Sequence, residues 1–136
     1  MAAFVLDASV VLAVALQETN RQLAASILGQ VVEDGAAVPG IWHVEVGNAL
    51  MIAERRKATL PEDRNEALLD LSRLPVTVDA ETAPRAWHDT LLLADRQRLT
   101  LYDATYLELA RRLGLPLATF DAALRRAAAA AGAKLL

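Results

Sequence analysis

The chain has 136 residues, of which 54% are hydrophobic and 23% charged, with a net charge of −3 and no cysteine. This length and composition suit one folded domain over residues 1–136 and argue against extended disorder. The lack of cysteine excludes disulfide bridges and thiolate-bound zinc, and a negative net charge does not by itself favour a nucleic-acid partner.

The first apolar segment, residues 2–15, contains a single acid, Asp7. It is too short to cross a bilayer, and no basic segment precedes it as in a signal peptide. We therefore expect a cytoplasmic protein that does not act at a membrane. An ionised carboxylate inside an apolar segment is costly to bury without a partner, so Asp7 needs an explanation.

Apolar strands alternate with helical patterns along the chain. Thr19 is the expected N-cap of the second helix, and Pro61 suits a first helical turn. In chain order the expected elements of the first half are a strand over residues 2–7, helices over 8–18 and 19–33, a strand over 36–40, and helices over 41–57 and 60–74. The apolar stripe of the long helix over 41–57 consists of Trp42, Val46, Leu50 and Ala53.

The second half continues the alternation. One amphipathic helix over residues 82–99 is expected to align Trp87, Leu91 and Ala94, and Gly114 marks the end of the next helix. The expected elements are a strand over 75–79, helices over 82–99 and 100–116, a strand over 117–121, a helix over 122–132 and a last strand over 133–136. The order predicts an α/β fold with a mostly parallel sheet of about five short strands, flanked by helices.

Four acids stand near the start of predicted helices, where each has an ordinary structural explanation. Asp7 and Asp121 follow strands and occupy positions typical of an N-cap. Asp103 follows Thr100 at the spacing of a capping box, and Glu45 lies in a first helical turn, where the helix dipole favours negative charge.

The four acids also share a position in the predicted fold. A parallel sheet brings the carboxyl ends of its strands to one edge, and such sheets bind ligands there. Asp7, Asp121, Glu45 and Asp103 would converge at that edge and repel one another unless they were protonated or bound a cation. Oxygen ligands without histidine or cysteine favour Mg²⁺, with Mn²⁺ as the other candidate. Neither His43 nor His88 has metal-ligand spacing, so we assign no site role to them.

Four sequence blocks carry a family resemblance: VLDASVVLA, WHVEVGNAL, LYDATYLELA and LATFDAAL. They resemble the signature blocks of PIN-domain ribonucleases, above all the VapC-type toxins of toxin–antitoxin pairs, and the likeness extends over essentially the whole chain. It implies a three-layer α/β/α fold and a catalytic quartet of Asp7, Glu45, Asp103 and Asp121. Ser9 and Thr119 match the hydroxyl residues that often accompany the quartet, and Asn48 fits the pattern ExxNAL.

The resemblance further implies a metal-dependent endoribonuclease in which Asp7, Asp103 and Asp121 hold Mg²⁺ and metal-activated water hydrolyses an RNA phosphodiester. Glu45 would be a further ligand or would orient the attacking water. The implied partners are RNA, a second copy of the chain in a homodimer, and a VapB-like antitoxin. The antitoxin tail would lie in an apolar groove, for which the helices after Asp7 and around Trp42 are the candidates.

Other functions remain open from sequence alone. A receiver-type phosphoacceptor domain would use Asp79 with Thr119 and Lys134, although it leaves Glu45 and Asp103 unexplained. A non-catalytic PIN-like interaction domain and a nuclease acting on DNA are the remaining alternatives. The basic groups at residues 55–57, 96–98, 111–112 and 125–126 are expected at helix ends, where they could also form a basic rim around the acids.

Overall fold

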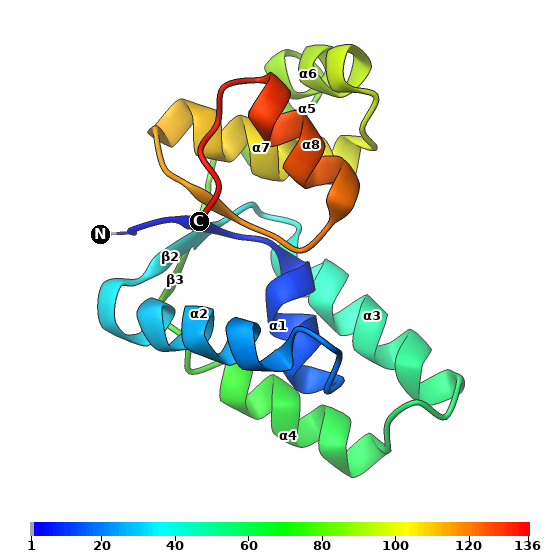
Figure 1. Cartoon of the computed structure of the whole chain (residues 1–136). Coiled ribbons are helices and arrows are strands. Elements are labelled where there is room, and N and C mark those ends of the chain that lie inside the picture. Colours follow the sequence, from blue (N-terminus) through cyan, green and yellow to red (C-terminus); the bar gives the residue numbers. More distant parts are fainter. Residues whose placement is uncertain (1) are drawn as a thin grey trace.

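The computed structural model describes residues 2–136 and forms a parallel sheet between two layers of helices (Figure 1). The elements of the first half are β1 (Val5–Leu6), α1 (Ala8–Ala15), α2 (Arg21–Asp34), β2 (Ala36–Val38), α3 (Trp42–Arg55) and α4 (Pro61–Leu71). The second half comprises β3 (Val76–Val78), α5 (Thr82–Ala86), α6 (Asp89–Gln97), α7 (Leu101–Leu113), β4 (Leu117–Ala118) and α8 (Ala122–Ala130).

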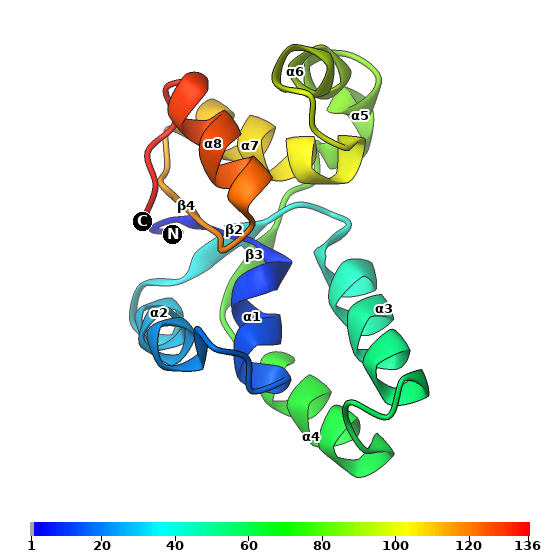
Figure 2. The same cartoon turned by 45° about the vertical axis from the view of Figure 1, so that its right-hand side comes forward.

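The helices divide into two groups, one on each face of the sheet. Helix α1 packs against α2, α3 and α4, whereas α7 packs against α5, α6 and α8. Figures 1 and 2 show the first group below the sheet and the second above it. The predicted α/β class, with three layers and a parallel sheet, is confirmed.

The strand order β3-β2-β1-β4 places β1 between β2, the next strand in the chain, and β4, the last one. Val5 pairs with Leu117 and Leu6 with Ala118, so the next residues, Asp7 and Thr119, emerge side by side at the carboxyl edge. The chain leaves β1 toward one face through α1 and leaves β4 toward the other through α8 (Figure 2). This divergence opens the sheet edge where doubly wound folds bind ligands.

The core is built from the central strands and the inner faces of the helices. Phe4, Val5 and Leu6 are fully buried, as expected for a parallel strand covered on both faces. The predicted stripe of α3 is also correct, since the buried residues of that helix are Trp42, Val46, Leu50 and Ala53. Burying this stripe packs α3 against α1, with Glu45 in the first turn of α3.

Three details of the predicted elements differ in the structure: the last strand, the start of the second helix, and the helix over 82–99. The last strand, over 133–136, is reduced to a single bridge between Leu117 and Leu135, because the chain touches β4 only briefly after α8. Thr19 is not an N-cap, since α2 is preceded by Asn20, whose side chain makes no capping hydrogen bond.

The predicted helix over 82–99 is two helices, α5 and α6, separated at Trp87 and His88. His88 has φ −119° and ψ −107°, outside the helical region. The break turns Thr90, Leu93 and Ala94 toward the interior, so the expected alignment of Trp87, Leu91 and Ala94 is wrong. Trp87 is 82% exposed.

Helix α4 is attached more loosely than the others of its layer. It contains no buried residue, and a groove of about 630 Å³ lies between it, α1 and α2. The groove lies at the carboxyl ends of α1 and α3, away from the edge that carries Asp7. In the described part of the chain, no helix is both long enough and apolar enough to cross a membrane.

Candidate active site

Asp7 is the buried centre of the site. It follows β1, caps α1, and is 6% exposed. Its Oδ2 accepts hydrogen bonds from Ser9 Oγ at 2.5 Å, Thr119 Oγ1 at 2.7 Å and the Ser9 amide at 3.4 Å. These donors all reach one carboxylate oxygen, so they fix the orientation of the side chain and leave Oδ1 available for another ligand.

Thr119 joins Asp7 to the second acid at the strand ends. Its hydroxyl donates to Asp7 and accepts from the amide of Asp121 at 3.0 Å. Asp121 in turn caps α8, where its Oδ2 accepts from the Leu124 amide at 2.8 Å. Ser9 Oγ accepts from the Phe120 amide at 3.0 Å, so both hydroxyl residues predicted beside the quartet tie β1 to β4.

Glu45 reaches the site from α3 and is held by a residue that the sequence analysis missed. The hydroxyl of the buried Tyr106 donates a hydrogen bond to Glu45 Oε1. Tyr106 lies three residues after Asp103, so both project from the same face of α7. That spacing is the signal that could have identified Tyr106 from the sequence.

Asp103 lies in the first turn of α7, and its predicted relation to Thr100 is present. The Thr100 hydroxyl accepts from the Asp103 amide at 3.1 Å and caps the helix. The cap therefore belongs to the Thr100 side chain and the Asp103 backbone. A capping role does not account for the carboxylate of Asp103.

The four acids interact electrostatically. Burial, followed by the charges of Asp121 and Asp7, raises the pKa of Asp103 to about 6. Burial also raises the pKa of Asp7, although hydrogen bonds from Ser9 and Thr119 partly offset this effect. Burial raises the pKa of Glu45 in the same way, and the hydrogen bond from Tyr106 partly offsets it. Among the residues that the structure describes, no lysine, arginine or histidine forms an ion pair with these acids. The site therefore carries uncompensated negative charge.

The donor set suits a hard divalent cation, because it offers carboxylate and hydroxyl oxygens only. Within residues 2–136, however, no three aspartate, glutamate or histidine side chains are placed to hold one ion together. Mg²⁺ commonly keeps several waters and is held by one or two carboxylates. Asp7, with its free Oδ1, and the neighbouring Asp103 and Asp121 would hold such an ion together with water.

The remaining predicted residues lie apart from this arrangement. Asn48 is exposed on α3, and its side chain has no hydrogen bond to the four acids among the residues described. Asp79 follows β3, which β2 separates from β1, and its carboxylate accepts from Arg112 at 2.6 Å and 3.2 Å. A receiver places its third strand beside the first, so the arrangement here does not support Asp79 as a phosphoacceptor.

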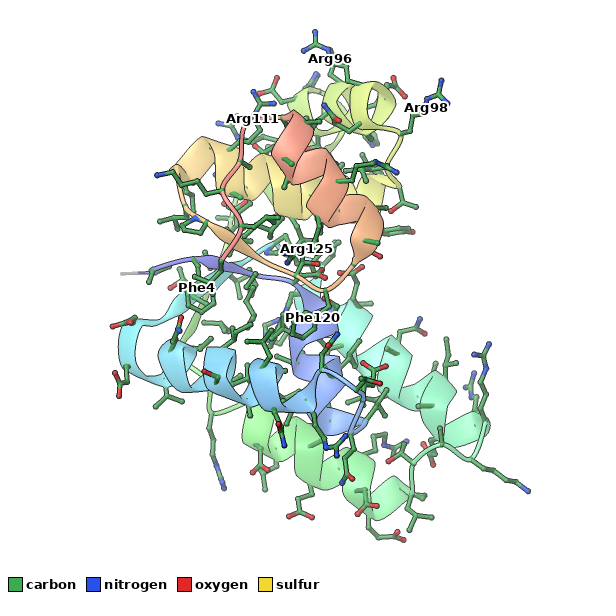
Figure 3. The ribbon with its side chains drawn as sticks, in the orientation of Figure 1. Phe4, Arg96, Arg98, Arg111, Phe120 and Arg125 are labelled. Atoms are coloured by element: carbon green, nitrogen blue, oxygen red, sulfur yellow. The ribbon has the colours of Figure 1, made fainter. Side chains whose placement is uncertain are left out.

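The basic groups do not form a ring around the acids. Figure 3 shows Arg96 and Arg98 extending outward at the α6 end, whereas Arg125 points toward the β4–α8 turn beside Phe120. Arg125 lies within α8 rather than at its end, and its Nη1 donates to the carbonyl of Thr119 at 2.9 Å. Arg125 therefore brings a positive charge to the rim of the acidic edge.

The fold and this edge define a class of protein: a three-layer α/β domain with converging acids at the carboxyl end of a parallel sheet. The family model for the PIN domain matches residues 4–130, and the chain therefore belongs to the PIN domain family. PIN domains are generally metal-dependent nucleases. The family predicted from the four sequence blocks is confirmed, whereas the VapC-type role stays a prediction.

One solved structure resembles this chain over most of the length of both proteins. The crystal structure of PAE2754 from Pyrobaculum aerophilum aligns with a TM-score of 0.64 and 23% sequence identity, covering 93% of this chain and 84% of that one. At this identity the similarity demonstrates a shared fold. No curated protein sequence matches the chain.

The raised pKa values predict how stability without metal depends on pH. A carboxyl with a folded-state pKa above its unfolded value binds protons more tightly in the folded state, so stability falls as pH rises through that interval. For Asp103 the interval runs from its ordinary value of 3.8 to about 6. In EDTA we expect the free energy of unfolding to fall by about 1 kcal/mol between pH 5 and pH 7, after allowance for solvent screening.

Urea denaturation at a series of pH values measures this dependence. Asp103→Asn removes the titrating group and should flatten the curve over the same interval. An unfolding free energy that rises from pH 5 to pH 7 in the unsubstituted protein would contradict the electrostatic description.

Proposed function

We propose that this PIN domain is a metal-dependent endoribonuclease whose active site is formed by Asp7, Glu45, Asp103 and Asp121. The observation that carries the proposal is the convergence of these acids, without a basic ion-pair partner in residues 2–136, at the edge where β1 and β4 end. Such a cluster is unfavourable for stability. A divalent cation would relieve the repulsion and make the cluster useful for hydrolysis.

The chain's own residues prepare this chemistry. Ser9 and Thr119 hold Asp7 with one oxygen free, and Tyr106 holds Glu45. Glu45 is then positioned to orient a water molecule, while Arg125 meets the phosphate backbone at the rim. A bound Mg²⁺ or Mn²⁺ would supply activation of water and charge neutralisation at the phosphate.

Metal dependence is the direct test of this activity. The purified protein should cleave single-stranded RNA in Mg²⁺, lose cleavage in EDTA and regain it when Mg²⁺ is restored. Because a ligand that binds only the folded state stabilises it, Mg²⁺ should also raise the melting temperature. The rise should be smaller in Asp103→Asn. Matched DNA oligonucleotides serve as the substrate control, and RNA cleavage that persists unchanged in EDTA would contradict the proposal.

The finer proposal is that the enzyme is a VapC-type toxin restrained by a VapB-like antitoxin. The groove under α4 supports a peptide partner better than the predicted surface around Trp42, which is 2% exposed and belongs to the core. The apolar floor of the groove includes Val11, Val14 and Leu28, and its rim includes Asp63, Glu66 and Asp70. Such a groove suits an amphipathic antitoxin segment that carries basic residues.

Expression in cells tests the toxin role. Production of the chain alone should arrest growth, and co-production of the protein encoded beside it should restore growth. Asp7→Asn, produced at the same level, is the control and should not arrest growth. Normal growth during production of a protein that cleaves RNA in vitro would favour a nuclease without a toxin role.

A homodimer is also proposed, and an exposed apolar patch supports it. Trp87, Leu91 and Leu92 lie within six consecutive residues of the α5–α6 region, and each is exposed. Large exposed apolar surfaces commonly mark protein interfaces. Sedimentation equilibrium should therefore give the dimer mass for the unsubstituted chain and the monomer mass for Leu91→Asp.

A further inference from the structure

A small pocket lies near the acidic edge, and the proposed function gives it no part. It has a volume of about 290 Å³ and is bounded by the β2–α3 loop, the start of α5 and the first turn of α7. Figure 2 shows the β2–α3 loop leaving the sheet beneath α5 and the start of α7. Its lining includes Gly40, Ile41, Thr82, Leu101, Tyr102 and Thr105.

Residues that line the pocket are close in sequence to two acids of the candidate active site. Tyr102 directly precedes Asp103 in α7, and Ile41 lies one helical turn before Glu45. A ligand bound at the acids would therefore have its neighbouring part within reach of this pocket. Tyr102 is 64% exposed, so its large aromatic ring is open to a ligand.

The polar groups around the pocket are already occupied by one another. Thr105 Oγ1 donates to the carbonyl of Tyr102 at 2.6 Å, and Thr82 Oγ1 accepts from the Gly40 amide at 2.9 Å. The carboxylate of Asp79 is taken by Arg112. No lysine or arginine lines the pocket in the part of the chain that the structure describes. The pocket thus offers apolar surface and an aromatic ring, and it has no cation for a phosphate.

We propose that this pocket receives a nucleobase of the RNA, stacked on Tyr102, next to the phosphate that is bound at the acids. The proposal rests on the proposed nuclease function and names Tyr102 as the residue that positions the substrate. Unstacked bases of single-stranded RNA commonly stack on exposed aromatic side chains. Because few free hydrogen-bonding groups line the pocket, its preference between bases should be weak, and it should favour single-stranded over paired RNA.

Scanning the substrate tests the position of the base. In a cleaved oligonucleotide, each nucleotide around the cut is replaced in turn by an abasic one, and kcat/KM is measured. The unsubstituted enzyme should lose about 5- to 150-fold at one position, which is the range found for removal of a base–aromatic stack. Tyr102→Ala should lose a similar factor on the intact RNA and show no further loss at that position. Tyr102→Phe keeps the ring and should behave like the unsubstituted enzyme.

Mononucleotide binding tests the pocket without relying on catalysis. In NMR titrations in EDTA, nucleoside 5′-monophosphates should shift the resonances of Tyr102, Thr105 and Gly40, whereas ribose 5-phosphate, which lacks the base, should not. Equal shifts by both probes, or equal abasic losses in Tyr102→Ala and the unsubstituted enzyme, would overturn the base pocket while leaving the nuclease function intact. If Tyr102→Ala instead dissociates a dimer, the pocket belongs to a protein interface and the proposal fails. An absence of RNA cleavage would refute the proposed function, and the mononucleotide shifts would still decide the pocket.

Discussion

Asp7→Asn is expected to reduce RNA cleavage by about 100-fold or more while leaving the metal-free protein at least as stable as the unsubstituted one. The loss of rate follows because a neutral amide binds a divalent cation poorly, and small misplacements of reacting groups cost about this factor. Stability should be retained because asparagine caps helices as well as aspartate does. The substitution also removes a buried negative charge, since Asp7 is 6% exposed and is repelled by Asp121.

The combination of these two outcomes separates an active-site acid from a capping residue. Steady-state cleavage in Mg²⁺ and urea denaturation in EDTA give the two measurements. Asp95→Asn, an exposed carboxylate on α6, is the matched control and should change neither. If Asp7→Asn lowered stability and cleavage only in proportion to each other, Asp7 would be structural and the metal site would have to lie elsewhere.

Arg112→Met is expected to destabilise the protein by about 3 kcal/mol. It leaves the enclosed carboxylate of Asp79 without a cation, and it leaves that of Glu108 with Arg85 alone, at 3.6 Å. Arg112 donates to Glu108 at 2.8 Å and to Asp79 at 2.6 Å. The side chains of Arg112, Asp79 and Glu108 are 16%, 11% and 8% exposed. Burial alone would raise the pKa of Asp79. The hydrogen bonds and charge of Arg112, together with hydrogen bonds from the Glu81 amide and the Thr82 hydroxyl, outweigh burial and hold this pKa below its usual range.

Denaturant titration at neutral pH measures the loss. Arg111→Met, at the exposed neighbouring arginine, provides the control and should change stability by less than about 0.5 kcal/mol. Adding Asp79→Asn and Glu108→Gln to Arg112→Met should recover much of the loss, since the unpaired charges are then gone. An Arg112→Met protein as stable as the Arg111→Met control would show that this network contributes little to folding.

The parts of the molecule that were predictable from sequence depend on local patterns. The alternation of strands and helices predicted the parallel sheet, and the position of Asp7 and Asp121 after strands placed both at one edge. The pairing of Thr119 with Asp7 follows from the same placement once β1 and β4 are neighbours. The Asp103–Thr100 relation was visible because it spans a single turn.

The features that the sequence analysis missed depend on contacts between distant segments. The ion pair between Asp79 and Arg112 requires the start of α5 to lie against α7, which no local pattern specifies. The break at His88 accompanies the packing of α6 against α7, a contact between segments that no local pattern specifies. The pocket at Tyr102 is likewise formed by three segments that meet only in the folded chain.

The absence of buried residues in α4 divides the molecule into parts of unequal local stability. Detaching α4 exposes little apolar surface, so it should cost much less free energy than unfolding the sheet. Because α4 rests on the carboxyl ends of α1 and α3, their amino ends, with Asp7 and Glu45, can stay in place when it opens. Its backbone amides should therefore exchange with solvent long before those of β1, which become accessible only when the whole domain unfolds. The chain should thus combine a stable acidic edge with a peripheral helix that unfolds locally and refolds while the rest of the domain stays folded.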